Sequence, residues 1–189
     1  MIQFQSLAPA AEPVSLAEVK RHLRLDGDAE DALLATLLAA ARDDVERQTG
    51  LALIRQTWRV VLDRLPPGRR VDLGRTPVMA VTSVSRFDRD GEVHAIAAGQ
   101  WRLDRHDRPA AVDLSGLAPG TDIANGIEID YEAGHGDTGA DVPDLLKRAI
   151  LLLAAHLFEH RSGSLVDDRV TAWPSGYDRL LAPFRRVRL

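Results

Sequence analysis

The chain has 189 residues, which at about 150 residues per domain predicts one domain, or one domain with an arm. The absence of cysteine excludes a disulfide framework, a thiolate nucleophile and a cysteine-ligated metal site. The formal net charge is −4, from 24 Lys and Arg against 28 Asp and Glu. This charge argues against a protein whose whole surface binds nucleic acid, because phosphates require a positively charged surface.

The hydropathy pattern predicts a protein that stays inside the cell that makes it. Residues 1–10 lack the basic region and the apolar core of a signal peptide. The longest apolar run, at residues 149–158, is interrupted by His156 and is too short to span a bilayer. We therefore expect a soluble protein without a membrane partner.

Two helices are predicted near the start of the chain, at residues 15–25 and 28–49. Ser15 is a good N-cap, and Glu18 three residues later completes a capping box. The second segment carries apolar residues at helical spacing, and Gly50 is a natural stop. Together the two segments predict a helical hairpin.

A β-rich insertion is predicted at residues 54–131, where the apolar residues change from helical spacing to alternation. Asp90 and Gly91 form a hairpin signal between two apolar runs, because this pair tolerates positive φ. The region is therefore expected to form a small antiparallel sheet or sandwich. Its strands are expected at residues 54–62, 71–73, 78–87, 92–96, 101–103, 111–114 and 127–131.

A third helix is predicted at residues 142–161, with Pro143 in its first turn. Residues 145–158 are apolar on nearly every side, so this helix is expected to be buried on more than one face. The predicted fold class is α+β: the helical hairpin and the long apolar third helix pack together, and the antiparallel sheet is inserted between them in sequence. Residues 1–161 are expected to form a single domain, followed by a linker and a C-terminal docking arm at residues 162–189.

One short motif is typical of a catalytic metal site. His156, Glu159 and His160 fit the H-x-x-E-H pattern of inverted zinc peptidases, in which two histidines hold the metal and the glutamate acts as base. Zinc needs a third protein ligand, yet no glutamate follows Glu159 in the sequence. The end of a helix also suits histidines, because the helix dipole favours cations there. We expect no metal, no cofactor and no catalytic residue, with a small zinc-dependent hydrolase as the alternative.

The C-terminal arm combines apolar and basic side chains. Such a segment is expected to dock on a partner rather than to stabilise its own domain. Its apolar residues and its lack of lysine favour a protein partner over phosphates. Trp173 beside Pro174, in an otherwise polar stretch, is a candidate interface anchor.

Several segments of the chain occur in a characteristic order and spacing, although none is a strict motif. They are PVSLAEVKRHLRL at 13–25, DALLATLLAAARDDVE at 31–46, TGLAL at 49–53, TW at 57–58, PVMAVTSV at 77–84, YEAGHGD at 131–137, VPDLLKRAILLLAAH at 142–156 and LLAPFRRVRL at 180–189. Together they cover nearly the whole chain. This set resembles the head–tail connector (adaptor) proteins of tailed bacteriophages and of phage-like gene transfer agents.

The resemblance implies a structural protein of a virion or gene transfer agent particle, made in the bacterial cytoplasm and located at the capsid vertex between head and tail. Such adaptors form a homo-oligomeric ring, commonly of twelve subunits, beneath the portal protein. The ring extends the DNA channel, through which DNA passes without sequence-specific binding, and it carries the downstream tail or stopper component. The family has no catalytic residues. Its C-terminal segment binds the portal, which assigns that role here to Leu180, Leu181, Phe184, Arg185, Arg186, Arg188 and Leu189.

The residues themselves are compatible with this resemblance. A ring needs an interface in which two different patches meet, and the apolar third helix and the amphipathic hairpin offer surface beyond one small core. A mildly acidic protein suits a channel through which DNA slides, because a positive lining would hold the DNA. Another neck or tail-completion protein of the same particle is the remaining alternative, which composition does not distinguish from an adaptor.

Overall fold

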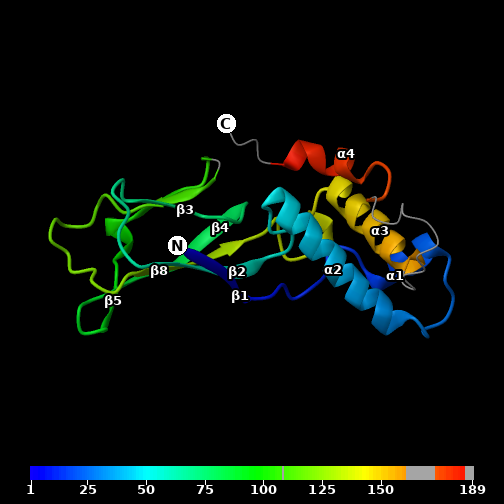
Figure 1. The fold of residues 1–189 in the computed structure, drawn as a ribbon, viewed down its shortest axis with the longest axis horizontal. Helices are drawn as coiled ribbons and strands as arrows, with labels where there is room; N and C mark the ends of the chain where they lie inside the picture. The colour runs from blue at the N-terminus through cyan, green and yellow to red at the C-terminus, as the bar shows by residue number, and fades with distance from the viewer. Residues whose placement is uncertain (108, 161–172, 186–189) are drawn as a thin grey trace. The chain divides into compact units, whose positions relative to one another are not determined.

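The computed structural model describes residues 1–107, 109–160 and 173–185, and these form a mixed fold of helices and antiparallel sheets (Figure 1). The chain forms two compact units. Unit 1 consists of Met1–Ala10 and Arg55–His135, and unit 2 consists of Ala11–Ile54 and Gly136–Leu189. The single domain expected at residues 1–161 stays a prediction.

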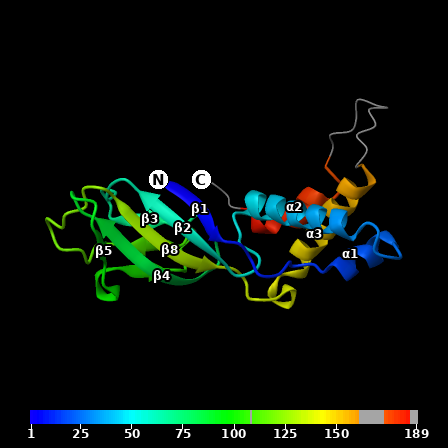
Figure 2. The same cartoon turned by 90° about the horizontal axis from the view of Figure 1, so that it is seen from below.

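Unit 1 contains a five-stranded antiparallel sheet in the order β1-β2-β8-β4-β5, with β1 and β5 at its two edges (Figure 2). Its strands are β1 (Ile2–Leu7), β2 (Gln56–Leu62), β8 (Ile127–Ala133), β4 (Val78–Phe87) and β5 (Val93–Ala95). A smaller antiparallel sheet has the order β3-β7-β6. It consists of β3 (Arg70–Asp72), β7 (Ala111–Asp113) and β6 (Arg102–Asp104), and the 3-10 turn η1 (Ala98–Gln100) precedes β6.

The central strands β2 and β8 alternate between buried and half-buried residues along their whole length. This alternation follows from strand geometry, because successive side chains point to opposite faces. Trp58 lies opposite Tyr131, and Val60 lies opposite Ile129, and all four side chains are buried. One face of the sheet therefore contributes to the apolar core of unit 1.

The strands expected between residues 54 and 131 lie within two residues of the observed strands, so the predicted β-rich insertion is confirmed. The predicted hairpin turn lies between β4 and β5. Gly91 adopts a φ of +83°, and its amide donates a hydrogen bond to the carbonyl oxygen of Asp88 at 3.1 Å. The edge strand β1 is an addition, because the sequence analysis assigned residues 2–7 to no element.

The described part of unit 2 contains four α-helices: α1 (Leu16–Leu23), α2 (Asp31–Thr49), α3 (Asp144–Glu159) and α4 (Tyr177–Leu181). Two 3-10 turns, η2 (Gly139–Asp141) and η3 (Ala182–Phe184), precede α3 and follow α4. No helix among the described residues is long and apolar enough to cross a membrane.

Local signals define the ends of the first two helices. The predicted capping box is present, since the Ser15 amide donates to Glu18 Oε2 at 2.8 Å and the Glu18 amide donates to Ser15 Oγ at 3.2 Å. Gly50 ends α2 in the left-handed conformation, with a φ of +72°. The start of α2 was predicted three residues too early, because residues 29 and 30 form a turn that precedes Asp31.

The core of unit 2 lies where α1, α2, α3 and α4 meet. Both α2 and α3 bury apolar side chains at helical spacing, and each packs against the other. The fully or nearly fully buried apolar residues of this core are Val14, Val19, Leu34, Leu38, Ala41, Val45, Leu53, Ile54, Val142, Leu146, Ala149, Ile150, Leu153, Ala154, Tyr177 and Leu181.

Candidate functional site

The described part of the C-terminal segment, residues 173–185, packs on the helices of its own unit. Helix α4 contacts α2 and α3, and the side chains of Tyr177 and Leu181 are fully buried in the core of unit 2. The expectation that this segment contributes little to its own domain is therefore wrong. The physical reason is that residues 177 and 181 lie one helical turn apart, so both side chains share one face of α4.

Polar contacts fix the same segment on α2. The Tyr177 hydroxyl donates a hydrogen bond to Asp44 Oδ2 at 2.8 Å. Burial raises the pKa of Tyr177 well above its usual value, and the hydrogen bond to Asp44 raises it further. After α4, Arg185 Nη2 donates to Gln48 Oε1 and to Asp178 Oδ1, both at 2.5 Å. The guanidinium thus joins the end of the segment to α2.

The residues predicted to bind a portal differ in accessibility. Besides the buried Leu181, Leu180 and Phe184 are half-buried against the core, and Arg185 is exposed. The others, Arg186, Arg188 and Leu189, lie outside the described residues. A portal-binding role for these side chains stays a prediction, and burial leaves Leu181 no direct part in such a contact.

Trp173 offers an exposed aromatic surface next to α4. Its side chain is 51% exposed, and its ring stacks on Tyr177 with centroids 5.5 Å apart and an interplanar angle of 10°. Because Tyr177 is buried, the stack holds the indole in one orientation while half of it stays accessible. A fixed, accessible tryptophan suits the centre of a protein–protein contact.

The H-x-x-E-H residues lie at the end of α3. The rings of His156 and His160 are 4.2 Å apart at an angle of 35°, and His160 Nδ1 lies 2.9 Å from the carbonyl oxygen of His156. Burial, together with the neighbouring His160, lowers the pKa of His156. In the part of the chain that the structure describes, no group of three or more His, Cys, Asp or Glu side chains is placed to hold a metal ion. The two histidines therefore gain no third protein ligand there.

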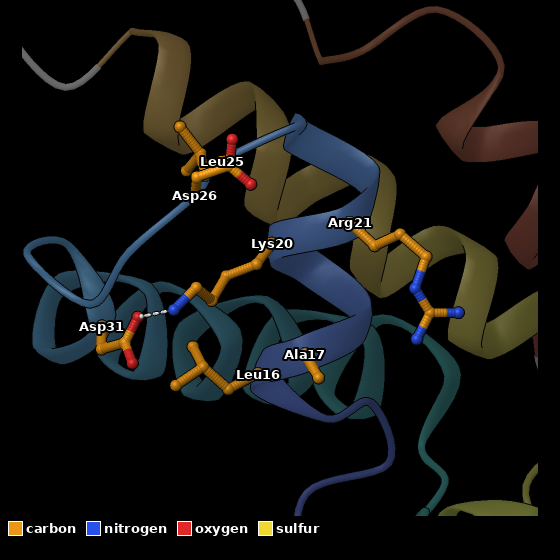
Figure 3. A pocket seen from close by; sticks show the side chains of 7 residues that line it. All are labelled: Leu16, Ala17, Lys20, Arg21, Leu25, Asp26 and Asp31. Carbon is orange, nitrogen blue, oxygen red and sulfur yellow. Dashed lines mark hydrogen bonds and ion pairs between the residues drawn. The ribbon is translucent and has the colours of Figure 1, made fainter.

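A shallow groove runs along α1 (Figure 3). Its lining residues are Leu16, Ala17, Lys20, Arg21, Leu25, Asp26 and Asp31. Lys20 Nζ lies 2.7 Å from Asp31 Oδ1, and this ion pair joins α1 to the start of α2 across the groove. The lining contains no histidine, serine or cysteine, and its lysine, Lys20, is held in the ion pair with Asp31.

The sequence analysis missed one apolar surface, on β1. Ile2, Phe4 and Leu7 are exposed there, at 66%, 45% and 66%. Apolar residues alternate with Gln3 and Gln5 along this segment. That period of two is the signal that predicts a strand at residues 2–7.

Comparisons with known proteins point to one family. Residues 13–81 match the family model of the phage gp6-like head–tail connector protein. No curated protein sequence matches the chain. Among solved structures, the chain is similar to a chain in the neck of an empty gene transfer agent (GTA) particle computed with C6 symmetry, with 32% identity and a TM-score of 0.83. This similarity covers 100% of the present chain and 97% of the other.

Two further structures agree with that similarity and cover the same shares of both chains. One is the virion of a native GTA particle, with 32% identity and a TM-score of 0.81. The other is the neck of a native GTA particle computed with C12 symmetry, with 31% identity and a TM-score of 0.79. Because identity above 30% extends over almost the full length of both chains, the protein belongs to the phage gp6-like head–tail connector family.

Proposed function

We propose that the protein is a ring-forming connector subunit that joins the head of a phage-like particle to its tail. The observation that carries this proposal is the 32% identity, over the whole of this chain, to a chain in the neck of a GTA particle. The neck relatives occur in structures computed with C6 and C12 symmetry, which supports a ring. Twelve copies form the complete ring that we propose, beneath the portal protein at the capsid vertex.

In this role the protein extends the DNA channel and provides the platform for the next tail component. The net charge of −4 favours such a channel, because a mildly acidic protein does not hold the phosphates of passing DNA. We assign the protein no catalytic activity, since its relatives are components of a particle neck and a virion. In this role the protein acts by binding the neighbouring proteins on either side of it.

The portal contact that we propose uses the C-terminal segment. Tyr177 and Leu181 fix α4 in the core of unit 2, so α4 serves as a rigid base for the residues that follow it. The exposed side chains around this base include the Trp173 indole, Arg179 and the Arg185 guanidinium, which is paired with the exposed Asp178. The sequence continues with the basic residues Arg186 and Arg188, and we propose that this aromatic and cationic segment binds an acidic or amphipathic partner segment.

Imaging of particles tests this function. Particles from cells that lack the gene are compared at the capsid vertex with particles from wild-type cells and from cells that carry the restored gene. We expect DNA-filled heads without tails, and loss of the ring directly beneath the portal. Tailed particles with an unchanged neck overturn the proposal. A missing ring further down the neck assigns the protein to a different neck position.

A further inference from the structure

The edge strand β1 has its polar and apolar faces reversed. Gln3 and Gln5 point into unit 1, where Gln3 Nε2 donates to the Tyr131 hydroxyl at 2.7 Å and Gln5 hydrogen-bonds the buried Gln56. The large apolar side chains of Ile2 and Phe4 point the other way and are exposed. An exposed apolar face is informative because monomeric proteins seldom keep one without a partner.

A β-bulge extends this apolar face to the end of the strand. The register shifts between Gln5 and Leu7, so that Leu7 pairs with Thr57. With regular alternation, Leu7 would lie on the same face as Gln5. The bulge instead places Leu7 on the face of Ile2 and Phe4. We call these three residues (Ile2, Phe4 and Leu7) the β1 margin.

A second apolar group lies at the opposite edge of the same face. Residues that are directly opposite in neighbouring strands share a face. Across the sheet, Ile2 pairs with Val61, Val61 with Glu128, Glu128 with Ser85, and Ser85 with Ala95. Ala95 and Val93, with its partner Phe87, thus lie on the face of Ile2. We call Phe87, Val93 and Ala95 the β5 margin, in which Val93 is 60% exposed.

Between the two margins the face is charged and internally paired. Arg59 donates to both carboxylate oxygens of Asp130, at 2.7 and 2.8 Å, and lies 3.1 Å from Glu128. Ser83 Oγ donates to Asp130 at 2.9 Å. These groups satisfy one another, so the centre of the face needs no partner. Among the described residues of unit 1, every exposed large hydrophobic side chain belongs to β5, to β1 or to the preceding Met1.

We propose that neighbouring subunits of the ring contact each other through these margins, with the β1 margin of one copy against the β5 margin of the next. This inference rests on the proposed function. A closed ring requires two different patches on every subunit, and the two edges of one sheet supply such a pair. Both margins are apolar, so their contact leaves no charge unpaired. Because the charged centre of the face lies between them, the two margins of one copy do not cover each other.

Cross-linking within particles tests the contact. The natural chain has no cysteine, so Phe4→Cys and Val93→Cys introduce the only thiols of the chain. Both positions are exposed, and the substitutions therefore leave the fold intact. Particles in which every copy of the chain carries both substitutions are treated with a bis-maleimide. The reagent is short, so that it joins cysteines on adjacent strands only. The chain is then detected on a denaturing gel.

The proposal predicts a ladder of multiples of 20.7 kDa that extends beyond the dimer, because each copy is linked on two sides. Each single variant is expected to stay monomeric. A matched control pairs Phe4→Cys with Leu145→Cys, an exposed apolar position on α3 in unit 2, and is expected to give no ladder. A ladder of equal strength in this control overturns the proposal.

The other outcomes are also decisive. Dimers from Phe4→Cys alone show that two β1 margins meet, which makes a closed pair and overturns the proposal. The double variant can stay monomeric although the particles contain the wild-type amount of the chain. This result overturns the margin contact and leaves the connector role intact. If the wild-type chain is never found in particles, the proposed function itself is overturned.

Discussion

The hydroxyl of Tyr177 donates a hydrogen bond to Oδ2 of Asp44 at 2.8 Å, which fastens α4 to the second-to-last turn of α2. The same carboxylate oxygen accepts a hydrogen bond from Gln48 Nε2 at 2.7 Å. Asp44 therefore holds a short helix that is far away in sequence. Residues 173–185, the described part of the C-terminal segment, are therefore attached to the core of unit 2.

The first prediction concerns Tyr177→Phe. The variant loses one hydrogen bond to a carboxylate and keeps the buried ring, so we expect a loss of about 1–2 kcal/mol in the free energy of unfolding at pH 7. Tyr177→Ala removes the ring as well, and about 3–5 kcal/mol is expected. Urea unfolding measures both values. Equal effects of the two variants would show that the ring contributes nothing.

The raised pKa of Tyr177 predicts a dependence on alkaline pH. The folded state keeps the phenol protonated, whereas the unfolded chain ionises near its usual pKa of about 10. The contribution of the Tyr177 hydroxyl to the free energy of unfolding is thus fully present below pH 10 and is lost as pH rises above it. We expect the difference in unfolding free energy between wild type and Tyr177→Phe to shrink from pH 9 to pH 11, to about the extent that the unfolded tyrosine ionises. A constant difference would contradict this assignment.

A third prediction concerns a buried ion network on α2. Arg42 Nε lies 2.8 Å from Glu12, and Arg42 Nη1 lies 3.5 Å from the buried Glu46, which also accepts the Leu53 amide at 2.7 Å. Arg42→Met removes a cation that contacts both Glu12 and the buried Glu46, so we expect a loss of about 3–5 kcal/mol. The matched control is Arg47→Met on the same helix, whose side chain is 72% exposed, and a change of under about 0.5 kcal/mol is expected there.

The double variant Arg42→Met with Glu46→Gln separates charge from packing. A neutral glutamine still accepts the Leu53 amide, and no unpaired charge stays buried. We expect the double variant to be more stable than Arg42→Met alone. If it is less stable, the loss in Arg42→Met comes from packing rather than from the negative charge of Glu46.

The sequence specifies the local structure of this protein well. The capping box of Ser15 and Glu18, the stop at Gly50 and the turn at Gly91 are each determined by residues within a few positions. Alternation indicates the long central strands β2 and β8, because one face of each is buried. These signals are short-range, so a single sequence is sufficient to identify them.

Features that depend on distant contacts are not predictable from the sequence of this chain alone. The burial of Leu181 depends on α2 and α3, and no pattern within a five-residue helix indicates them. On β1, alternation indicates a strand but not which face meets the core. The usual rule assigns the apolar residues to the core, yet here Gln3 points inward to Tyr131. The subunit contact proposed for β1 accounts for this reversal, because local sequence rules fail most often at functional sites.

A fourth prediction concerns acid pH and unit 1. The Arg59 guanidinium holds the pKa of Asp130 below its usual value. The contribution of the Asp130 carboxylate to the free energy of unfolding is present above the unfolded pKa of about 3.9. It is lost as pH falls through the lower folded pKa. We expect Asp130→Asn to cost about 1 kcal/mol at pH 7, because solvent screens the partly exposed pair, and to converge with wild type as pH falls toward 2. Asp63→Asn, at an exposed position in the same unit, serves as the control and is expected to change the free energy of unfolding at pH 7 by under about 0.5 kcal/mol.

The last prediction separates the portal contact from folding. A chain that ends after Arg185 keeps α4 and the contacts of Tyr177 and Leu181, so we expect its thermal unfolding to match that of the full chain. It loses Arg186, Arg188 and Leu189, and we expect it to be absent from particles. Trp173→Ala is expected to be absent as well, with a loss of stability of only about 0.5–1.5 kcal/mol from the broken stack.

Leu181→Ala is the control for this experiment, because it creates a cavity in the core of unit 2 and is expected to cost about 2–5 kcal/mol. A deletion from residue 180 onward combines both effects, so it cannot test docking alone. If the chain that ends after Arg185 enters particles at the wild-type level, the removed residues do not bind the portal. If Trp173→Ala also enters normally, the portal contact lies outside the C-terminal segment.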